Sequence, residues 1–294
     1  MDQWLRDFIV KKWKVGTLPF TFLDVLLAVC ITGTGVMLRL SVVEYTPTDL
    51  QKMAAMALDF VLALFCAVIV YNLTAHRLKA FLTYAILVIY PTMVANSALW
   101  GKNSILYAFL FFLGLYLYLK GQKLLAVIST AAGAFLGISG MYVSKYTLNL
   151  GWPNFYEIID KKMFVELYNQ VSVLILAGML LTLAYIGLRK RVVVTKDLAL
   201  QLFLFLAILV PYFAPSMTAC AGYVSDIAAL LYAMRWLNKF YVPMLHLIVS
   251  YCAYANILNG ESKLPMVIYA VILLVLLVDV GTGIYQSVRE AANP

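Results

Sequence analysis

The chain has 294 residues, of which 64% are hydrophobic, and its mean hydropathy is +0.90. This composition leaves no room for a separate soluble domain, so we expect a single membrane domain over residues 1–294. The net charge of +8 is divided among many short loops. It therefore indicates membrane orientation and contact with anionic lipid, and we expect no nucleic-acid partner.

Long apolar stretches separated by short charged loops predict an all-α polytopic membrane protein with about ten transmembrane helices. The segment 222–234 is short enough to be re-entrant. The expected spans cover residues 19–38, 54–73, 80–97, 104–119, 124–143, 169–188, 198–216, 222–234, 240–257 and 264–286.

Two segments outside the spans have the pattern of interfacial helices. Residues 1–18 interleave aromatic and aliphatic residues with lysines, which predicts a helix on the cytoplasmic leaflet. In 144–168, Trp152, Phe155, Ile159 and Met163 recur at helical spacing. They predict an outer interfacial helix and loop, with Asn154 accepting a hydrogen bond from the backbone of Glu157 as in a capping box.

Fifteen of the 22 basic residues fall on one side if the N-terminus is inside. Basic residues near span ends resist translocation, so both termini are predicted to be cytoplasmic. The inner residues are Arg6, Lys11, Lys12, Lys14, Arg77, Lys79, Lys120, Lys123, Arg189, Lys190, Arg191, Lys196, Arg235, Lys239 and Arg289. The outer ones are Arg39, Lys52, Lys102, Lys145, Lys161, Lys162 and Lys263.

Acidic residues within or at the ends of spans are costly and mark candidate functional positions. They are Asp24, Asp59, Asp226 and Asp279. His246, in a span, is interpreted as a hydrogen-bonded packing residue. The histidines and cysteines have no metal-ligand spacing, and no phosphate-binding loop or catalytic triad is recognisable. We therefore expect no cofactor, and consider a divalent cation only if the chain is catalytically active.

Three stretches carry a likeness to a known family: Tyr90–Gly101 (YPTMVANSALWG), Trp152–Tyr156 (WPNFY), and Pro211–Met217 (PYFAPSM) with Gly222–Ala233 (GYVSDIAALLYA). In order and spacing they resemble bacterial membrane glycosyltransferases of the GT-C superfamily, in particular the Gpi18-like mannosyltransferase group. The resemblance implies a GT-C-like fold in a bacterial-type plasma membrane. It also implies transfer of a sugar from a polyprenyl phosphate at the outer face.

The chain departs from the family pattern at three positions. Lys102, Asn103 and Ser104 follow Trp-Gly where the family has Gln-Cys-Asp, and Thr218–Ala221 stand where it has His-Glu-Arg-Tyr. The first outer loop is also short. Only Glu44 and Asp49 remain there as candidate catalytic bases. The candidate ligands for the lipid phosphate or substrate are Arg39, Lys52, Lys102, Asn103, Trp100 and Tyr223.

Three readings stay open. The first is a degenerate GT-C-like protein that binds a polyprenyl-phosphate-linked sugar or acts as the membrane partner of another protein. The second is a divergent active transferase that uses Asp49 or Glu44 together with Lys102. The third is a transporter or a structural membrane subunit, although no inverted repeat supports it.

Overall fold

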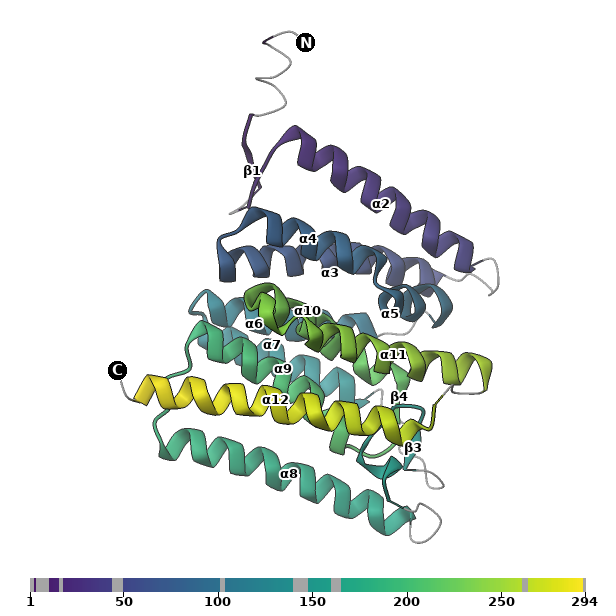
Figure 1. Cartoon of the computed structure of the whole chain (residues 1–294), viewed down its shortest axis with the longest axis vertical. Helices are drawn as coiled ribbons and strands as arrows, with labels where there is room; N and C mark the ends of the chain where they lie inside the picture. Colours follow the sequence, from purple (N-terminus) through teal and green to yellow (C-terminus); the bar gives the residue numbers. More distant parts are fainter. Residues whose placement is uncertain are drawn as a thin grey trace. The chain divides into compact units, whose positions relative to one another are not determined.

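The computed structural model describes residues 3, 11–15, 18–43, 50–100, 104–139, 148–159, 165–260 and 264–292. They form two compact units, Met1–Gly133 and Ala134–Pro294, each built from helices (Figure 1). This division does not test the expectation of one membrane domain, which stays a prediction.

Unit 1 is a small bundle in which α3 packs against α4 and α6, and α2 packs against α4. Leu62, Ile69, Leu87 and Phe112 are fully buried in it. Its elements are β1 (Trp13–Val15), β2 (Leu18–Phe20), α2 (Phe22–Val43), α3 (Leu50–Thr74), α4 (Arg77–Ile89), α5 (Pro91–Val94), the π-helix η1 (Ala95–Trp100), α6 (Ser104–Leu119) and most of α7 (Lys123–Ser139).

In unit 2, α9 packs against α12 and α10, and α11 packs against α10 and α12. Helix α10 is buried along nearly its whole length, whereas the apolar window of α8 is only 6% buried. The elements are β3 (Asn149–Leu150), the 3₁₀ turn η2 (Phe155–Glu157), α8 (Val165–Arg189), α9 (Lys196–Phe213), β4 (Met217–Thr218), η3 (Ala219–Gly222), α10 (Tyr223–Arg235), η4 (Leu237–Lys239), α11 (Tyr241–Asn259) and α12 (Met266–Ala292).

The prediction of an all-α membrane protein is confirmed. A helix lies within each of the ten expected spans, and six helices in the described part are long and apolar enough to cross a membrane. Helix α4 and its continuation from Pro91 are bent by 46° and give a seventh span if counted together. Helix α10 has 13 residues, so it covers about 20 Å of a hydrocarbon layer of roughly 30 Å. The count of ten spans stays a prediction.

Of the helix expected over 1–18, Gln3 is helical, but the described residues 13–15 and 18 are not. Trp13–Val15 pairs antiparallel with Leu18–Phe20, so this part is a hairpin. Gly16 and Pro19 explain the difference, because glycine weakens a helix and proline removes a backbone donor and disfavours the helical region in the residue before it. Residues 4–10 of the predicted helix lie outside the described residues.

The outer helix expected within 144–168 is also wrong where the structure describes it. Residues 149–150 form a strand and only Phe155–Glu157 make a single 3₁₀ turn. Gly151 has a φ of +103°, a backbone conformation that ends regular structure, and Pro153 lacks a donor. The Asn154 side chain accepts from the backbone N–H of Tyr156 at 3.1 Å, one residue earlier than predicted. Met163 lies outside the described residues.

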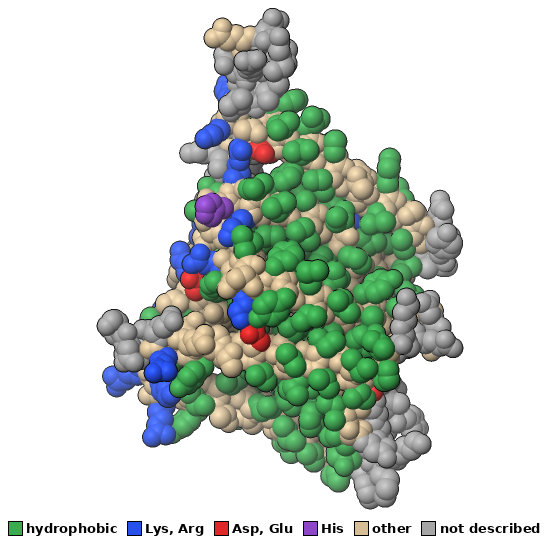
Figure 2. All heavy atoms as spheres, viewed as in Figure 1, with side chains coloured by type: hydrophobic (Ala, Val, Ile, Leu, Met, Phe, Trp, Pro, Cys, Tyr) green, Lys and Arg blue, Asp and Glu red, His purple; other side chains and the backbone are tan. Residues whose placement is uncertain are grey.

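In unit 2 the basic residues that the structure describes gather at one end of the antiparallel helices. In Figure 2, Lys and Arg side chains lie at the ends of α8 and α12, with hydrophobic side chains along both helices. Two ion pairs link helices at this end. Arg235 donates two hydrogen bonds of 2.7 Å to Asp197, and Lys239 lies 2.8 Å from Asp279. This grouping is typical of a cytoplasmic end, although the side of the membrane stays a prediction.

Candidate functional site

A broken helix in unit 1 contains the first of the three family-like stretches. Pro91 cannot donate a hydrogen bond to the preceding turn, and Tyr90 before it takes an extended conformation with ψ of 122°. The carbonyl of Val88 lies in the last turn of α4, beside the break. The Nη1 of Arg39 donates to that carbonyl at 2.8 Å, so a side chain from α2 satisfies the broken end of α4.

Arg39 is held by a fully buried ion pair. Its Nη2 and Nε donate to Asp59 Oδ2 at 3.0 and 3.3 Å, and its Nη1 also donates to the carbonyl of Gly35 at 3.2 Å. The guanidinium lies 4.7 Å from the centre of the Phe60 ring. Its donors are used inside the bundle, so Arg39 has a structural role there. Its contact with a lipid phosphate stays a prediction.

After the break, the chain continues into η1, a π-helix that packs against α2 and α3. Asn96 in η1 is fully buried, and neither its Oδ1 nor its Nδ2 has a hydrogen-bond partner among the described residues. π-Helical turns occur often at functional sites, and an unsatisfied buried amide calls for an explanation such as a ligand or a bound water. Asn96 is therefore a candidate polar contact in unit 1.

The second and third family-like stretches meet in unit 2. We call this meeting point the loop junction and define it as residues 148–157 and 213–222. Strands β3 and β4 pair in parallel there, with Asn149 opposite Met217. The backbone N–H of Trp152 donates to Met217 O at 3.2 Å. Two segments about sixty positions apart in sequence are thus held as one structure.

Tyr156 fastens the junction to the end of α9. Its hydroxyl donates to the carbonyl of Phe213 at 2.8 Å, and the ring is buried. Burial raises the pKa of the Tyr156 hydroxyl, against a smaller lowering effect from a hydrogen bond with Ser172. The hydroxyl therefore stays protonated at neutral pH and acts as a donor.

The Trp152 indole lies directly on Gly222, the last residue of η3. A Cβ at position 222 would come within 2.2 Å of Trp152 Cη2 and 2.9 Å of Ser250 Oγ. Only glycine allows this approach, since real Cβ atoms do not come so close. The indole is 1% exposed, and its ring centre lies 6.0 Å from that of His246.

Beneath the indole is a polar cluster of three fully buried side chains, Asp226 of α10 with His246 and Ser250 of α11. His246 Nδ1 lies 2.7 Å from Asp226 Oδ1, and Ser250 Oγ donates to the same oxygen at 2.9 Å. His246 and Ser250 are four residues apart and share one face of α11. The carboxylate fixes the orientation of the imidazole, as a carboxylate does in many acid–base and metal sites.

Two nitrogen atoms near this cluster lack partners. Within the described part of the chain, neither His246 Nε2 nor Trp152 Nε1 has a hydrogen-bond partner, and both are buried. Leaving a buried polar group unsatisfied costs about 1–3 kcal/mol. The hydrogen bond of His246 predicted from sequence is present, but it uses only one of the two ring nitrogens.

The predicted site residues that the structure describes are divided between the two units. Arg39 and the half-buried Lys52 belong to unit 1, while Tyr223 is fully buried at the start of α10 in unit 2. Trp100 ends η1, but its side chain is outside the described set. The remaining candidates, Glu44, Asp49, Lys102 and Asn103, lie outside the described residues.

Sequence reasoning noted the charges of Arg39, Asp59, Asp226 and His246 but missed how they pair. The available signal was their depth in adjacent antiparallel helices. Asp226 lies about as far before the end of α10 as Ser250 lies after the start of α11. In two antiparallel helices this places both residues at the same depth in the bundle. When each span is considered alone, these four residues have no visible partners.

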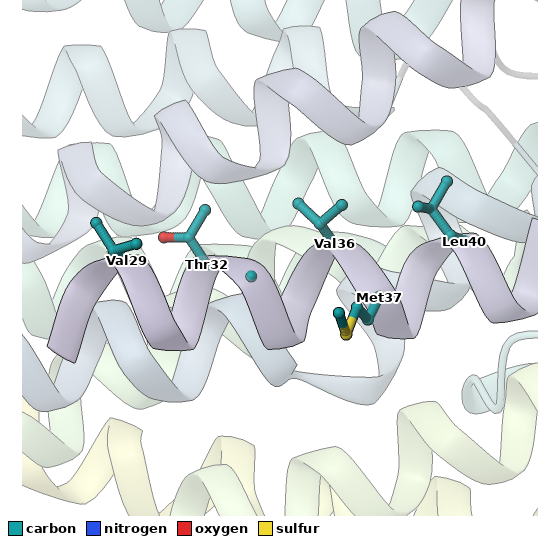
Figure 3. Close-up of a pocket in the computed structure, with 6 residues that line it drawn as sticks. Val29, Thr32, Val36, Met37 and Leu40 are labelled. Atoms are coloured by element: carbon teal, nitrogen blue, oxygen red, sulfur yellow. The ribbon is translucent and has the colours of Figure 1, made fainter. Parts of the chain in front are cut away.

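A hollow on α2 is lined by apolar side chains. Figure 3 shows Val29, Thr32, Val36, Met37 and Leu40 along the helix. The hydroxyl of Thr32 is already bonded to Ala28 O and lies 2.5 Å from the Tyr84 hydroxyl. Nothing in this hollow can do acid–base chemistry. No group of three His, Cys, Asp or Glu in the described part is arranged to hold a metal.

No family model, no curated protein and no solved structure matches this chain.

Proposed function

We propose that this chain is a GT-C-like membrane protein that binds a polyprenyl-phosphate-linked sugar at its outer face and has lost the transferase chemistry of the family. The observation that carries the proposal is the loop junction. Trp152–Tyr156 and Pro211–Met217 resemble the family in sequence and are bonded to each other in unit 2. Stretches that served only to face lipid would not need this backbone pairing.

The loss of chemistry is supported by the side chains within the junction. Thr218, Ala219, Cys220 and Ala221 occupy the positions where the family has His-Glu-Arg-Tyr, and they form the end of β4 and most of η3. Cys220 is buried and cannot replace a charged group. Transfer from a lipid phosphate needs a base for the acceptor and positive charge on the leaving phosphate. Neither is available from these four residues.

The proposal includes a bacterial-type plasma membrane, and its alternative to lipid-sugar binding is a role as the membrane partner of another protein. A bundle of apolar helices surrounding a buried polar cluster suits a ligand that enters from the lipid phase, because the prenyl chain can stay in the membrane. The phosphate would then lie at the interface near the loop junction. The sugar is the part of the ligand that needs polar partners.

Binding and transfer can be measured separately on purified full-length protein in lipid nanodiscs. With radiolabelled polyprenyl-phosphate mannose, we expect saturable binding that unlabelled polyprenyl phosphate reduces, and no release or transfer of label. Empty nanodiscs give the background, and Asp197→Ala, at the opposite end of unit 2 from the loop junction, serves as a matched acidic variant. Absence of binding above background contradicts the proposal, and so does rapid transfer that Asp49→Ala abolishes.

A second candidate is an active but divergent transferase, and the polar cluster favours it. A carboxylate that orients an imidazole is an arrangement that can accept a proton from a hydroxyl. Under this proposal transfer would be seen in wild type and reduced about 10²–10⁴-fold in His246→Asn. Transfer that instead requires Asp49 or Glu44 would assign the base to the first outer loop.

A further inference from the structure

Trp152 Nε1 and His246 Nε2 are two buried nitrogens without partners, contributed by two rings whose centres lie 6.0 Å apart. Trp152 comes from the loop junction and His246 from the middle of α11. The indole nitrogen can only donate a hydrogen bond, whereas the imidazole nitrogen can donate or accept. The chemistry that would satisfy both atoms depends on the protonation of the pair formed by His246 and Asp226.

If Asp226 and His246 carry no net charge together, Nε2 holds a proton. Either the imidazolium faces the carboxylate, or a protonated carboxyl donates to Nδ1 of an imidazole that is protonated on Nε2. If the pair is negative, Nδ1 donates to Asp226 and Nε2 presents a lone pair. The site then changes from two donors to one donor and one acceptor.

A hydroxyl group fits both states. It can accept from Trp152 and from a protonated Nε2, and it can accept from Trp152 while donating to an unprotonated Nε2. An anionic oxygen fits only the first state and would add a negative charge beside the buried Asp226, which is costly in an apolar interior. A neutral hydroxyl is therefore the better ligand for this position.

We infer that Trp152 and His246 form a subsite for a hydroxyl of the saccharide, with Asp226 and Ser250 as positioning residues that hold the imidazole. The inference rests on the proposed function for the identity of the ligand. Trp152 covers the cluster from a non-helical segment, in which its own N–H donates to Met217 O and the Asn154 amide donates to Leu148 O and Ala214 O. Segments of this kind open more readily than packed helices, which gives the sugar a route to the buried nitrogens.

The test compares polyprenyl-phosphate mannose with sugar-free polyprenyl phosphate on the full-length protein in nanodiscs. Two variants remove one nitrogen each and keep the surroundings. Trp152→Phe keeps an aromatic ring in the loop junction, and His246→Asn keeps an amide donor near Asp226 in place of Nδ1. Each is expected to weaken binding of the sugar lipid roughly three- to tenfold and to leave binding of the sugar-free lipid unchanged. His76→Asn, in an exposed loop, is the control.

A spectroscopic readout separates this subsite from a merely structural role. The chain has two histidines, so ¹⁵N-histidine labelling of His76→Asn protein leaves the His246 imidazole as the single ring signal. We expect the sugar lipid and octyl glucoside to shift the Nε2 resonance, and polyprenyl phosphate to leave it in place. Nδ1 should move less, since Asp226 holds it in every state.

The outcomes separate the two claims. If the sugar lipid binds but the variants bind it as wild type does and Nε2 does not move, the subsite is overturned and lipid binding stands. If neither lipid binds, the proposed function fails, and octyl glucoside decides the subsite alone. A shift of Nε2 with octyl glucoside that is lost in Trp152→Phe supports it, and an unchanged resonance overturns it.

Discussion

Replacing Arg39 with methionine is expected to destabilise the protein by about 3–5 kcal/mol, because it leaves Asp59 as a buried charge without its cation. Both side chains are essentially inaccessible, at 1% and 0% exposure. The substitution also removes the donor that satisfies Val88 O at the end of α4. The end of α4 should therefore loosen when the ion pair is lost. The expected result is a lower midpoint when the protein in mixed micelles is unfolded at equilibrium.

The double variant Arg39→Met, Asp59→Leu shows whether the loss of stability comes from the unpaired charge of Asp59 or from lost packing. A buried pair replaced by apolar residues of similar volume is often neutral or better, so most of the lost stability should return. Asp197→Asn is the matched control, because its pair with Arg235 is 40% and 35% exposed and should cost less than about 1 kcal/mol. A single Arg39→Met variant as stable as Asp197→Asn contradicts the role assigned to the pair.

Helix positions could be predicted from the sequence because the length of an apolar stretch can be read from that segment alone. Each expected span contains a helix, and the boundaries of α6 agree with 104–119. Even the short span at 222–234 corresponds to the 13 residues of α10. Hydropathy works here because every backbone group in a membrane must be satisfied within its own segment, and a helix does this without tertiary partners.

The segment around Trp152 could not be predicted in the same way. Its large apolar residues recur at helical spacing, but Gly151 and Pro153 interrupt the pattern, and the backbone pairs with residues 216–218. Helical spacing cannot reveal a partner about sixty positions away. The local signals that would have warned against a helix were the glycine and the proline, which weigh more than side-chain periodicity when they fall within a single turn.

The pairing of Arg39 was missed for a related reason. From the sequence, Arg39 was placed among the outer basic residues and named as a candidate ligand of a lipid phosphate. Asp59 lies in the next helix and pairs with Arg39. The free-energy cost of burying either charge is low only when the two are buried as a pair. The same holds for Asp226 with His246. Chemistry that depends on two helices is visible only once their packing is known.

Replacing Gly222 with alanine is expected to displace the Trp152 indole and to cost about 1–3 kcal/mol, the usual range for overpacking a core. Gly222 has a φ of −72°, so alanine is acceptable to the backbone and the cost comes from the clash alone. The new Cβ would lie 2.2 and 2.3 Å from two indole carbons. Equilibrium unfolding measures the cost, and binding of polyprenyl-phosphate mannose should weaken in the same variant.

Gly178→Ala in α8 is the matched control, because a Cβ there meets nothing within 4 Å. Alanine favours a helix over glycine by up to about 1 kcal/mol, so this variant should be neutral or slightly more stable. Combining Gly222→Ala with Trp152→Phe should return part of the lost stability, since the smaller ring leaves room for the methyl group, but should not restore sugar-lipid binding. A Gly222→Ala variant that keeps both stability and binding would show that the indole can move away without consequence, and Trp152 would then have no part in holding a ligand.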